Sequence, residues 1–234
     1  MRVLALETSG RVGSIALLTA PADGPAEVVA AQALPPGERS AQTLLPAVKQ
    51  LLAEQQWRPT DLGLIATTTG PGSFTGLRIG VVAAKTLAYA LRTQLVGVHT
   101  LAAMALAWRQ CIASTPPAEA PARLWTVLDA QRQELFAACF ERGSDLASEP
   151  APPTSILAVD DWLGRLAPGD AVTGPPLSKL LDRLPAGAAP LPASEWSPSA
   201  SATGLLAIEL ERRGHTTAPL SLAPNYYRKS AAEE

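Results

Sequence analysis

The glycine-rich segment Gly70-Pro-Gly-Ser-Phe-Thr-Gly76 stands between a pattern typical of a buried strand and a helical pattern. Its glycines would let backbone amides approach a partner closely, and the N-terminus of the following helix favours anions. Phosphate contacts at Gly72 and Ser73 are therefore one interpretation. The segment lacks the Lys-Ser/Thr pair of a P-loop, and its GxGxxxG spacing differs from GxGxxG. A structural turn with tight helix packing is the alternative interpretation.

A second set of polar residues, Glu7-Thr8-Ser9, ends the first apolar run of the chain. Together with the glycine segment, these side chains could surround phosphates. Metal ligation has less support, because His99 and His215 are the only histidines and are far apart. Two cysteines do not make a zinc motif, and no Ser-His-Asp or Cys-His set is evident from spacing. We therefore expect no metal site and no catalytic residues.

The end of the chain joins aromatic and cationic side chains in Tyr226-Tyr-Arg-Lys229. Tyr227, Arg228 and Lys229 could contact RNA or a partner. Terminal segments of this kind are more commonly docked by their tyrosines, with their charges in water.

The helix expected at residues 77–91 is apolar nearly all round and carries small residues at three- to four-residue spacings. Such a stripe lets another helix come close, so the helix is either fully buried in its own chain or packed against a second chain. For the second case, the expected interface consists of Gly76, Leu77, Gly80, Val81, Ala84, Leu87, Ala88 and Leu91.

The elements that would position these residues follow from periodicity and turn residues. We predict strands at 2–7, 12–19, 27–34, 62–69 and 95–98, and helices at 40–54, 77–91 and 101–112. This order predicts a mixed sheet with helices packed on it. Strands at 124–128 and 134–140 and a helix at 200–213 belong to a second, proline-rich lobe. We place the lobes at 1–110 and 111–234.

Composition bounds the function. The 234 residues are 47% hydrophobic and 17% charged, with a net charge of −2, which argues against a general nucleic-acid binder. The first residues do not form a signal peptide, because Glu7 and Ser9 end the apolar run too early. The apolar stretch at 95–108 is too short to span a bilayer. We therefore expect a cytoplasmic protein.

Several segments together resemble the TsaD family, and within it the small TsaB-like (YeaZ-like) paralogues. The segments that carry the resemblance are Val3–Ser9, Gln42–Leu52, Gly70–Gly80, Gly97–Ala105, Val127–Phe136 and Pro224–Ser230. The match is dense to about residue 110 and patchy beyond. It implies an α/β fold of the actin/Hsp70/sugar-kinase (ASKHA) type, with two lobes, each a mixed sheet flanked by helices.

The resemblance also implies a role. TsaB-like proteins are non-catalytic partners that bind TsaD through the first lobe, and the ATPase TsaE joins them. TsaD transfers threonylcarbamoyl to the adenosine beside the anticodon of tRNAs that read ANN codons, so tRNA would be an indirect partner. The chain would have no cofactor of its own, with ATP or ADP as candidates at the complex interface.

The sequence departs from the wider family at three informative positions. TsaD holds its metal with paired histidines on a helix, where this chain has Ser40-Ala-Gln-Thr. Glu7 replaces the aspartate usual in the first phosphate loop, and Gln131 stands where relatives often have arginine. The missing histidines agree with a chain that has no metal and no catalysis of its own.

Two other functions are compatible with these residues. The chain could be a nucleotide- or metal-dependent transferase or peptidase of the same fold that acts alone. It could also be a homodimer whose helix 77–91 pairs with itself across a two-fold axis, at least when TsaD is absent.

Overall fold

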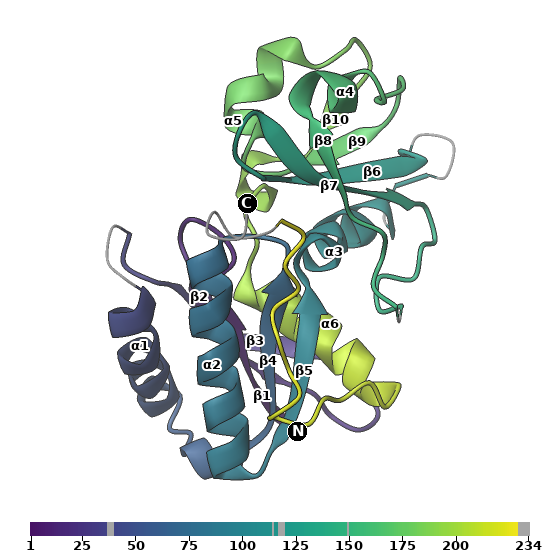
Figure 1. The fold of residues 1–234 in the computed structure, drawn as a ribbon. Coiled ribbons are helices and arrows are strands. Elements are labelled where there is room, and N and C mark those ends of the chain that lie inside the picture. The colour runs from purple at the N-terminus through teal and green to yellow at the C-terminus, as the bar shows by residue number, and fades with distance from the viewer. Residues whose placement is uncertain (37–39, 114, 117–119, 149, 229–234) are drawn as a thin grey trace. The chain divides into compact units, whose positions relative to one another are not determined.

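The computed structural model describes residues 1–36, 40–113, 115–116, 120–148 and 150–228 (Figure 1). The chain divides into two compact units. The first unit contains Met1–Thr100 and Pro198–Asn225, and the second contains Leu101–Ser197 and the described residues from Tyr226 on.

The first unit is built on a five-stranded mixed sheet in the order β3-β2-β1-β4-β5. The strands are β1 Arg2–Glu7, β2 Ser14–Thr19, β3 Glu27–Ala33, β4 Leu62–Gly70 and β5 Gln94–His99. β1, β2 and β3 pair antiparallel through short turns, whereas β4 and β5 lie parallel to β1. Parallel neighbours need crossover connections, which α1 (Ser40–Glu54) and α2 (Phe74–Leu91) provide.

The second unit repeats this plan. Its strands are β6 Arg123–Asp129, β7 Glu134–Glu141, β8 Ser155–Ala158, β9 Ala171–Thr173 and β10 Ala189–Pro190, in the order β10-β9-β6-β7-β8. An antiparallel run of three strands again precedes two parallel additions. The crossovers are the short helices α4 (Val159–Leu163) and α5 (Leu177–Leu180). The expected ASKHA-type plan, two mixed sheets flanked by helices, is confirmed.

The helix that follows each sheet belongs to the other unit. All of α3 (Thr100–Ala113) except its first residue falls in the second unit, and α6 (Ala200–Arg212) falls in the first. α6 buries Leu206, Ala207 and Leu210 against the first sheet, and Ser14 Oγ accepts the Ala200 amide at 2.9 Å. The units therefore differ from the expected lobes 1–110 and 111–234, because α6 completes the first core.

Most predicted elements lie within a few residues of the observed ones, and one helix boundary is instructive. α2 begins at Phe74 rather than Leu77 because the Ser73 hydroxyl caps it, accepting the Gly76 amide at 3.2 Å. Short 3-10 helices lie at Pro59–Asp61, Leu181–Arg183 and Ala193–Glu195.

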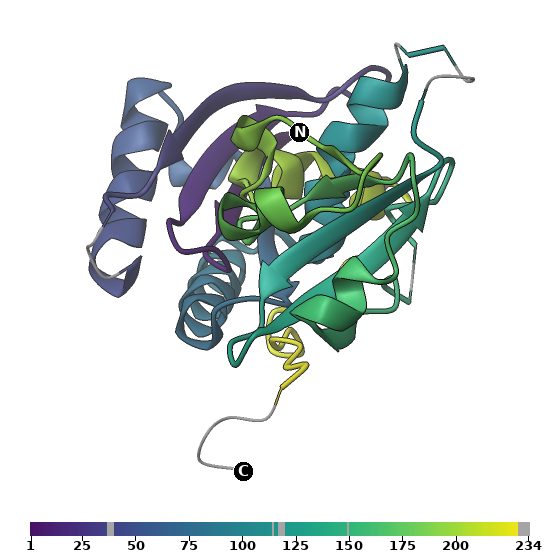
Figure 2. The same cartoon turned by 90° about the horizontal axis from the view of Figure 1, so that it is seen from above.

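Helices cover both faces of the first sheet (Figure 1 and Figure 2). On one face, Leu4, Leu6, Ile15 and Leu17 share a core with side chains of α1 and α2. On the other face, Ala5 and Leu18 lie against Gly204 of α6. Alternation along the strands thus supplies apolar side chains to both faces, as expected for a sheet buried on both sides.

α2 packs so closely on the sheet that two of its glycines have no room for a side chain. A Cβ at Gly76 would lie 1.9 Å from the Thr8 carbonyl oxygen. A Cβ at Gly80 would lie 2.3 Å from Thr8 Oγ1. These positions bring the helix backbone directly onto the end of β1.

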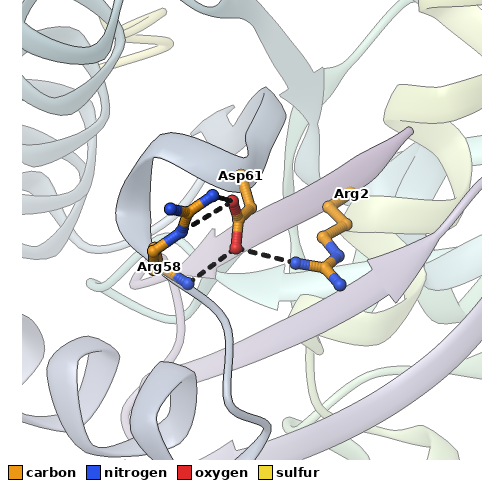
Figure 3. A network of polar contacts seen from close by, with 3 residues as sticks. All are labelled: Arg2, Arg58 and Asp61. Atoms are coloured by element: carbon orange, nitrogen blue, oxygen red, sulfur yellow. Dashed lines mark hydrogen bonds and ion pairs between the residues drawn. The ribbon is translucent and has the colours of Figure 1, made fainter.

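An ion-pair network lies where the parallel strands β1 and β4 begin, at the ends away from Thr8 (Figure 3). Asp61 Oδ2 accepts Arg2 Nη1 at 2.8 Å and the Arg58 amide at 2.9 Å, and Oδ1 accepts the Arg58 guanidinium. Hydrogen bonds from Arg58 hold the pKa of Asp61 below its usual value. The Arg2 guanidinium also lies over the Trp57 ring, 4.7 Å from its centroid. This network ties the first residues of the chain to the start of β4.

The buried His99 at the end of β5 predicts a pH dependence of stability. Burial lowers the pKa of His99 to about 4, below its ordinary 6.5. Between these values the unfolded state binds more protons, so stability is lost as pH falls through this window, by about 3 kcal/mol at most. We expect His99→Gln to flatten the dependence of the unfolding free energy between pH 7 and 4, measured by urea denaturation. The exposed His215→Gln is the control, and an unchanged slope in His99→Gln would contradict the assignment.

The close packing at Gly76 predicts a large cost for one methyl group. Gly76→Ala forces the helix away from Thr8, and we expect a loss of about 2 kcal/mol or more of unfolding free energy. Gly164→Ala is the matched control, because Gly164 has φ −68° and its Cβ would make ordinary contacts at 3.5 Å. Denaturant titration of both variants checks this, and equal stabilities would show that the helix can shift at no cost.

Candidate functional site

The carboxyl ends of β1 and β4 bring together the five residues that the sequence suggested as phosphate contacts. Glu7, Thr8 and Ser9 follow one another at the end of β1, and Gly72 and Ser73 follow β4. The Ser73 amide donates to the Ser9 carbonyl oxygen at 2.8 Å. The two segments, 63 positions apart in sequence, therefore form one structural unit.

The Glu7 carboxylate is fully buried and accepts hydrogen bonds from its own loop. Its Oε1 accepts the Ser9 amide at 2.6 Å, the Gly10 amide at 3.2 Å and the Ser9 hydroxyl. The Thr68 hydroxyl approaches the carboxyl without reaching hydrogen-bond geometry, so Oε2 has no partner among the described residues. Burial raises the pKa of Glu7, and the hydrogen bonds from Ser9 and Gly10 oppose that effect.

The glycine loop packs against this segment rather than around an open space. A Cβ at Gly72 would meet Ser9 Cβ at 2.6 Å, and Thr8 Oγ1 donates to the Gly76 carbonyl oxygen at 2.7 Å. The interpretation as a structural turn accounts for these contacts. Phosphate binding at Glu7, Thr8, Ser9, Gly72 and Ser73 remains a prediction. The Ser9 and Gly10 amides already donate hydrogen bonds to the Glu7 carboxylate.

The structure places the small-residue stripe of α2 against its own sheet. Six of the eight expected interface residues are buried within the chain, and the other two are half-buried. The buried ones are Gly76, Leu77, Gly80, Val81, Ala84 and Ala88, and the half-buried ones are Leu87 and Leu91. The stripe thus lets the helix approach the sheet, and a partner could reach these six only if the helix left the sheet.

The outward face of α2 carries a different set of residues, which the sequence reasoning missed. Val82 is 61% exposed and Tyr89 is 70% exposed, two helical turns apart. One turn before Val82, the Arg78 guanidinium lies over the Phe74 ring, 4.0 Å from its centroid. The signal was present in the sequence, because these residues follow the same helical period as the small stripe on the opposite side.

A segment near the end of the chain lies beside this face. Lys85 Nζ donates to the carbonyl oxygens of Leu220 and Leu222, at 3.2 and 2.8 Å. The Leu222 side chain is buried in the core, whereas Leu220 is 81% exposed. The segment is further held by Thr217, whose amide donates to the Leu95 carbonyl oxygen at 2.8 Å. Lys85 therefore holds the segment that carries the exposed Leu220 next to α2.

A further exposed apolar side chain, Leu45, lies on α1. It stands in a helical pattern of apolar residues together with Leu44, Val48, Leu51 and Leu52. Leu45 is 51% exposed, while the other four are buried. Leu45 therefore adds an exposed apolar side chain to the outward side of α1.

The tail residues suggested for RNA contact are docked on the second unit. The Tyr227 ring meets Phe136 edge-on, with 6.2 Å between the centroids, and Arg228 forms an ion pair with Glu134. Lys229 lies outside the described residues. Tyr227 and Arg228 are therefore engaged by their own unit, and RNA contact by these residues remains a prediction.

Two other properties of the described residues bear on the site. No group of three or more metal-ligating side chains comes together in them. α2 is the helix of the described chain that is long and apolar enough to cross a membrane. Its glycine and alanine stripe packs on the first sheet, so the fold accounts for its apolar character.

Comparisons with known proteins identify the relatives of the chain. The family model described as TsaD, tRNA N6-adenosine threonylcarbamoyltransferase, matches residues 36–211, more than half of the chain. The tRNA threonylcarbamoyladenosine biosynthesis protein TsaB of Bacillus subtilis is 30% identical over 170 residues, which are 73% of this chain and 68% of that protein. The Escherichia coli TsaB is 36% identical over 143 residues, covering 61% of this chain and 56% of that protein.

A solved structure extends the similarity over the whole fold. YeaZ from Pseudomonas aeruginosa matches with a TM-score of 0.72 and 26% identity, covering 96% of this chain and 99% of that one. The resemblance drawn from the sequence motifs is thereby confirmed at the level of family and fold. The chain belongs to the TsaD family and, within it, to the TsaB or YeaZ-like branch.

Proposed function

We propose that this chain is a non-catalytic subunit that binds and activates TsaD in the formation of N6-threonylcarbamoyladenosine on tRNAs reading ANN codons. The relatives named above carry a role in threonylcarbamoyladenosine biosynthesis in their names. The binding surface in this proposal is the outward side of α1 and α2, which we call the helical face: Leu45, Val82, Tyr89 and Leu220.

One observation carries the proposal. Among the described residues, the large apolar side chains that are more than half exposed are these four. They come from α1, from α2 and from the segment that Lys85 holds against α2. Single exposed apolar residues need no explanation, but several gathered over neighbouring elements favour an interaction site. Tyrosine, here Tyr89, is typical of the residues that contribute most to binding.

The relationship between the proposed partners supports this surface. TsaD gives its name to the family of this chain, so its first lobe should present an equivalent sheet and helices. Two related lobes can pair through the same helices about a pseudo-two-fold axis, as identical chains do about a true one. For the same reason we propose that a second copy of this chain occupies the helical face when TsaD is absent.

The remaining parts of the proposal concern the assembly. We propose that TsaE joins the complex, that any ATP or ADP binds at the complex interface, and that the chain has no cofactor of its own. A net charge of −2 favours partners as the main tRNA-binding surface. Such a complex would act in the cytoplasm.

The alternative, an enzyme that acts alone on nucleotide or metal, has less support. It requires the loop after β1 to offer its amides to phosphates. In this chain the Glu7 carboxylate accepts hydrogen bonds from the Ser9 and Gly10 amides. A bound phosphate would have to displace this buried carboxylate. Repulsion between the two anions would add to that cost.

The helical face predicts the effect of a single charge. Val82→Arg places a guanidinium in the proposed apolar contact, where an unpaired charge is costly. We expect the dissociation constant for TsaD, measured by calorimetry, to rise at least about tenfold, or ~1.4 kcal/mol. The melting temperature should stay near that of the parent chain, because Val82 is exposed.

Leu181→Arg is the matched control, since Leu181 is also exposed, at 44%, and lies in the second unit. It should bind TsaD like the parent chain. If Val82→Arg also binds TsaD like the parent chain, the helical face is not the TsaD-binding surface.

A further inference from the structure

Glu7 is a buried titratable residue for which the proposed function above gives no role. Its side chain is 0% exposed, and its Oε1 accepts two backbone amides and one hydroxyl of the next three residues. A carboxylate placed in this way holds a loop in one conformation. The contacts of that loop show what it supports.

The loop of Thr8 and Ser9 holds the beginning of α2 through two hydrogen bonds. The Ser9 carbonyl oxygen accepts the Ser73 amide at 2.8 Å, which fixes the residue that caps the helix. Thr8 Oγ1 donates to the Gly76 carbonyl oxygen at 2.7 Å, in the first turn. These bonds join a loop on β1 to the first turn of the helix that presents the helical face.

The close fit makes this junction sensitive to the position of the loop. Gly76 and Gly72 leave no space between α2 and the backbone of Thr8 and Ser9, since a Cβ at either would lie under 3 Å from those residues. A shift of the loop must therefore move the helix, because the two backbones are in direct contact. The side chains Val82 and Tyr89 would move with it.

We infer that Glu7 is a positioning residue for partner binding. It fixes the position of α2 on the first sheet through the Thr8–Ser9 loop. The inference rests on the proposed function, because it assumes that α2 presents the TsaD-binding surface. It assigns to Glu7 a hydrogen-bond-accepting role that depends on side-chain length. It gives no role to the negative charge as a ligand for a cation or as a base.

Three substitutions at position 7 separate the effect of side-chain length from the effect of side-chain charge. Glu7→Gln keeps the length and one acceptor oxygen, and its amide group would replace Oε2, which has no hydrogen-bond partner in the described residues. Glu7→Asp keeps the charge but withdraws the carboxylate from the Ser9 and Gly10 amides. Glu7→Ala removes both. Positioning predicts that Gln is tolerated and Asp is not, whereas a charge-based role predicts the reverse order.

The first readout is the dissociation constant for TsaD, measured on the full chain with melting curves for each variant. We expect Glu7→Gln to stay within about threefold of the parent chain, and Glu7→Asp and Glu7→Ala to bind at least about tenfold more weakly. A variant that is only less stable but still fully folded would bind normally. If Glu7→Ala does not fold, the comparison of Gln with Asp still decides.

The second readout needs no partner. Hydrogen exchange at the Ser73 amide and in the first turn of α2 should accelerate in Glu7→Asp and remain slow in Glu7→Gln. A parent chain that fails to bind TsaD would contradict the proposed function, while the exchange pattern would still test the positioning. Tight binding and slow exchange in Glu7→Asp, with losses in Glu7→Gln, would overturn the inference.

Discussion

The contact between the backbone of Thr8 and Ser9 and the first turn of α2 is the constraint on which the first unit depends. No side chain fits between them at Gly72 or Gly76, and hydrogen bonds from Ser73 and Thr8 cross the junction. This contact decides which side of α2 faces the sheet. The opposite side, with Val82 and Tyr89, then faces outward and becomes available to a partner.

The same plan occurs twice in the chain, and the two copies have different uses in this account. Each unit has three antiparallel strands followed by two parallel additions. The crossover helices of the first unit are long, 15 and 18 residues, whereas those of the second have five and four. Long helices supply a surface that a partner can cover, so the helical face belongs to the first unit.

Much of the fold follows from local sequence, while the site depends on contacts between distant segments. The apolar runs and turn residues gave the strands of the first sheet and the helix at Ser40–Glu54 correctly. Periodicity also placed the small residues of α2 on one side of the helix. It could not show which side faces the sheet, because that depends on Thr8, some 70 positions earlier. For the same reason the roles of Glu7 and Lys85, and the exposure of Leu220, could not be foreseen.

We propose that the chain acts through TsaD and has no catalysis of its own. The direct measurement is reconstitution of threonylcarbamoyladenosine on tRNA with TsaD, TsaE, the enzyme that makes the threonylcarbamoyl adenylate, threonine, bicarbonate and ATP. We expect modification only when this chain is added, and none when the chain replaces TsaD. Modification at an undiminished rate without the chain, or modification by the chain in place of TsaD, would contradict this proposal.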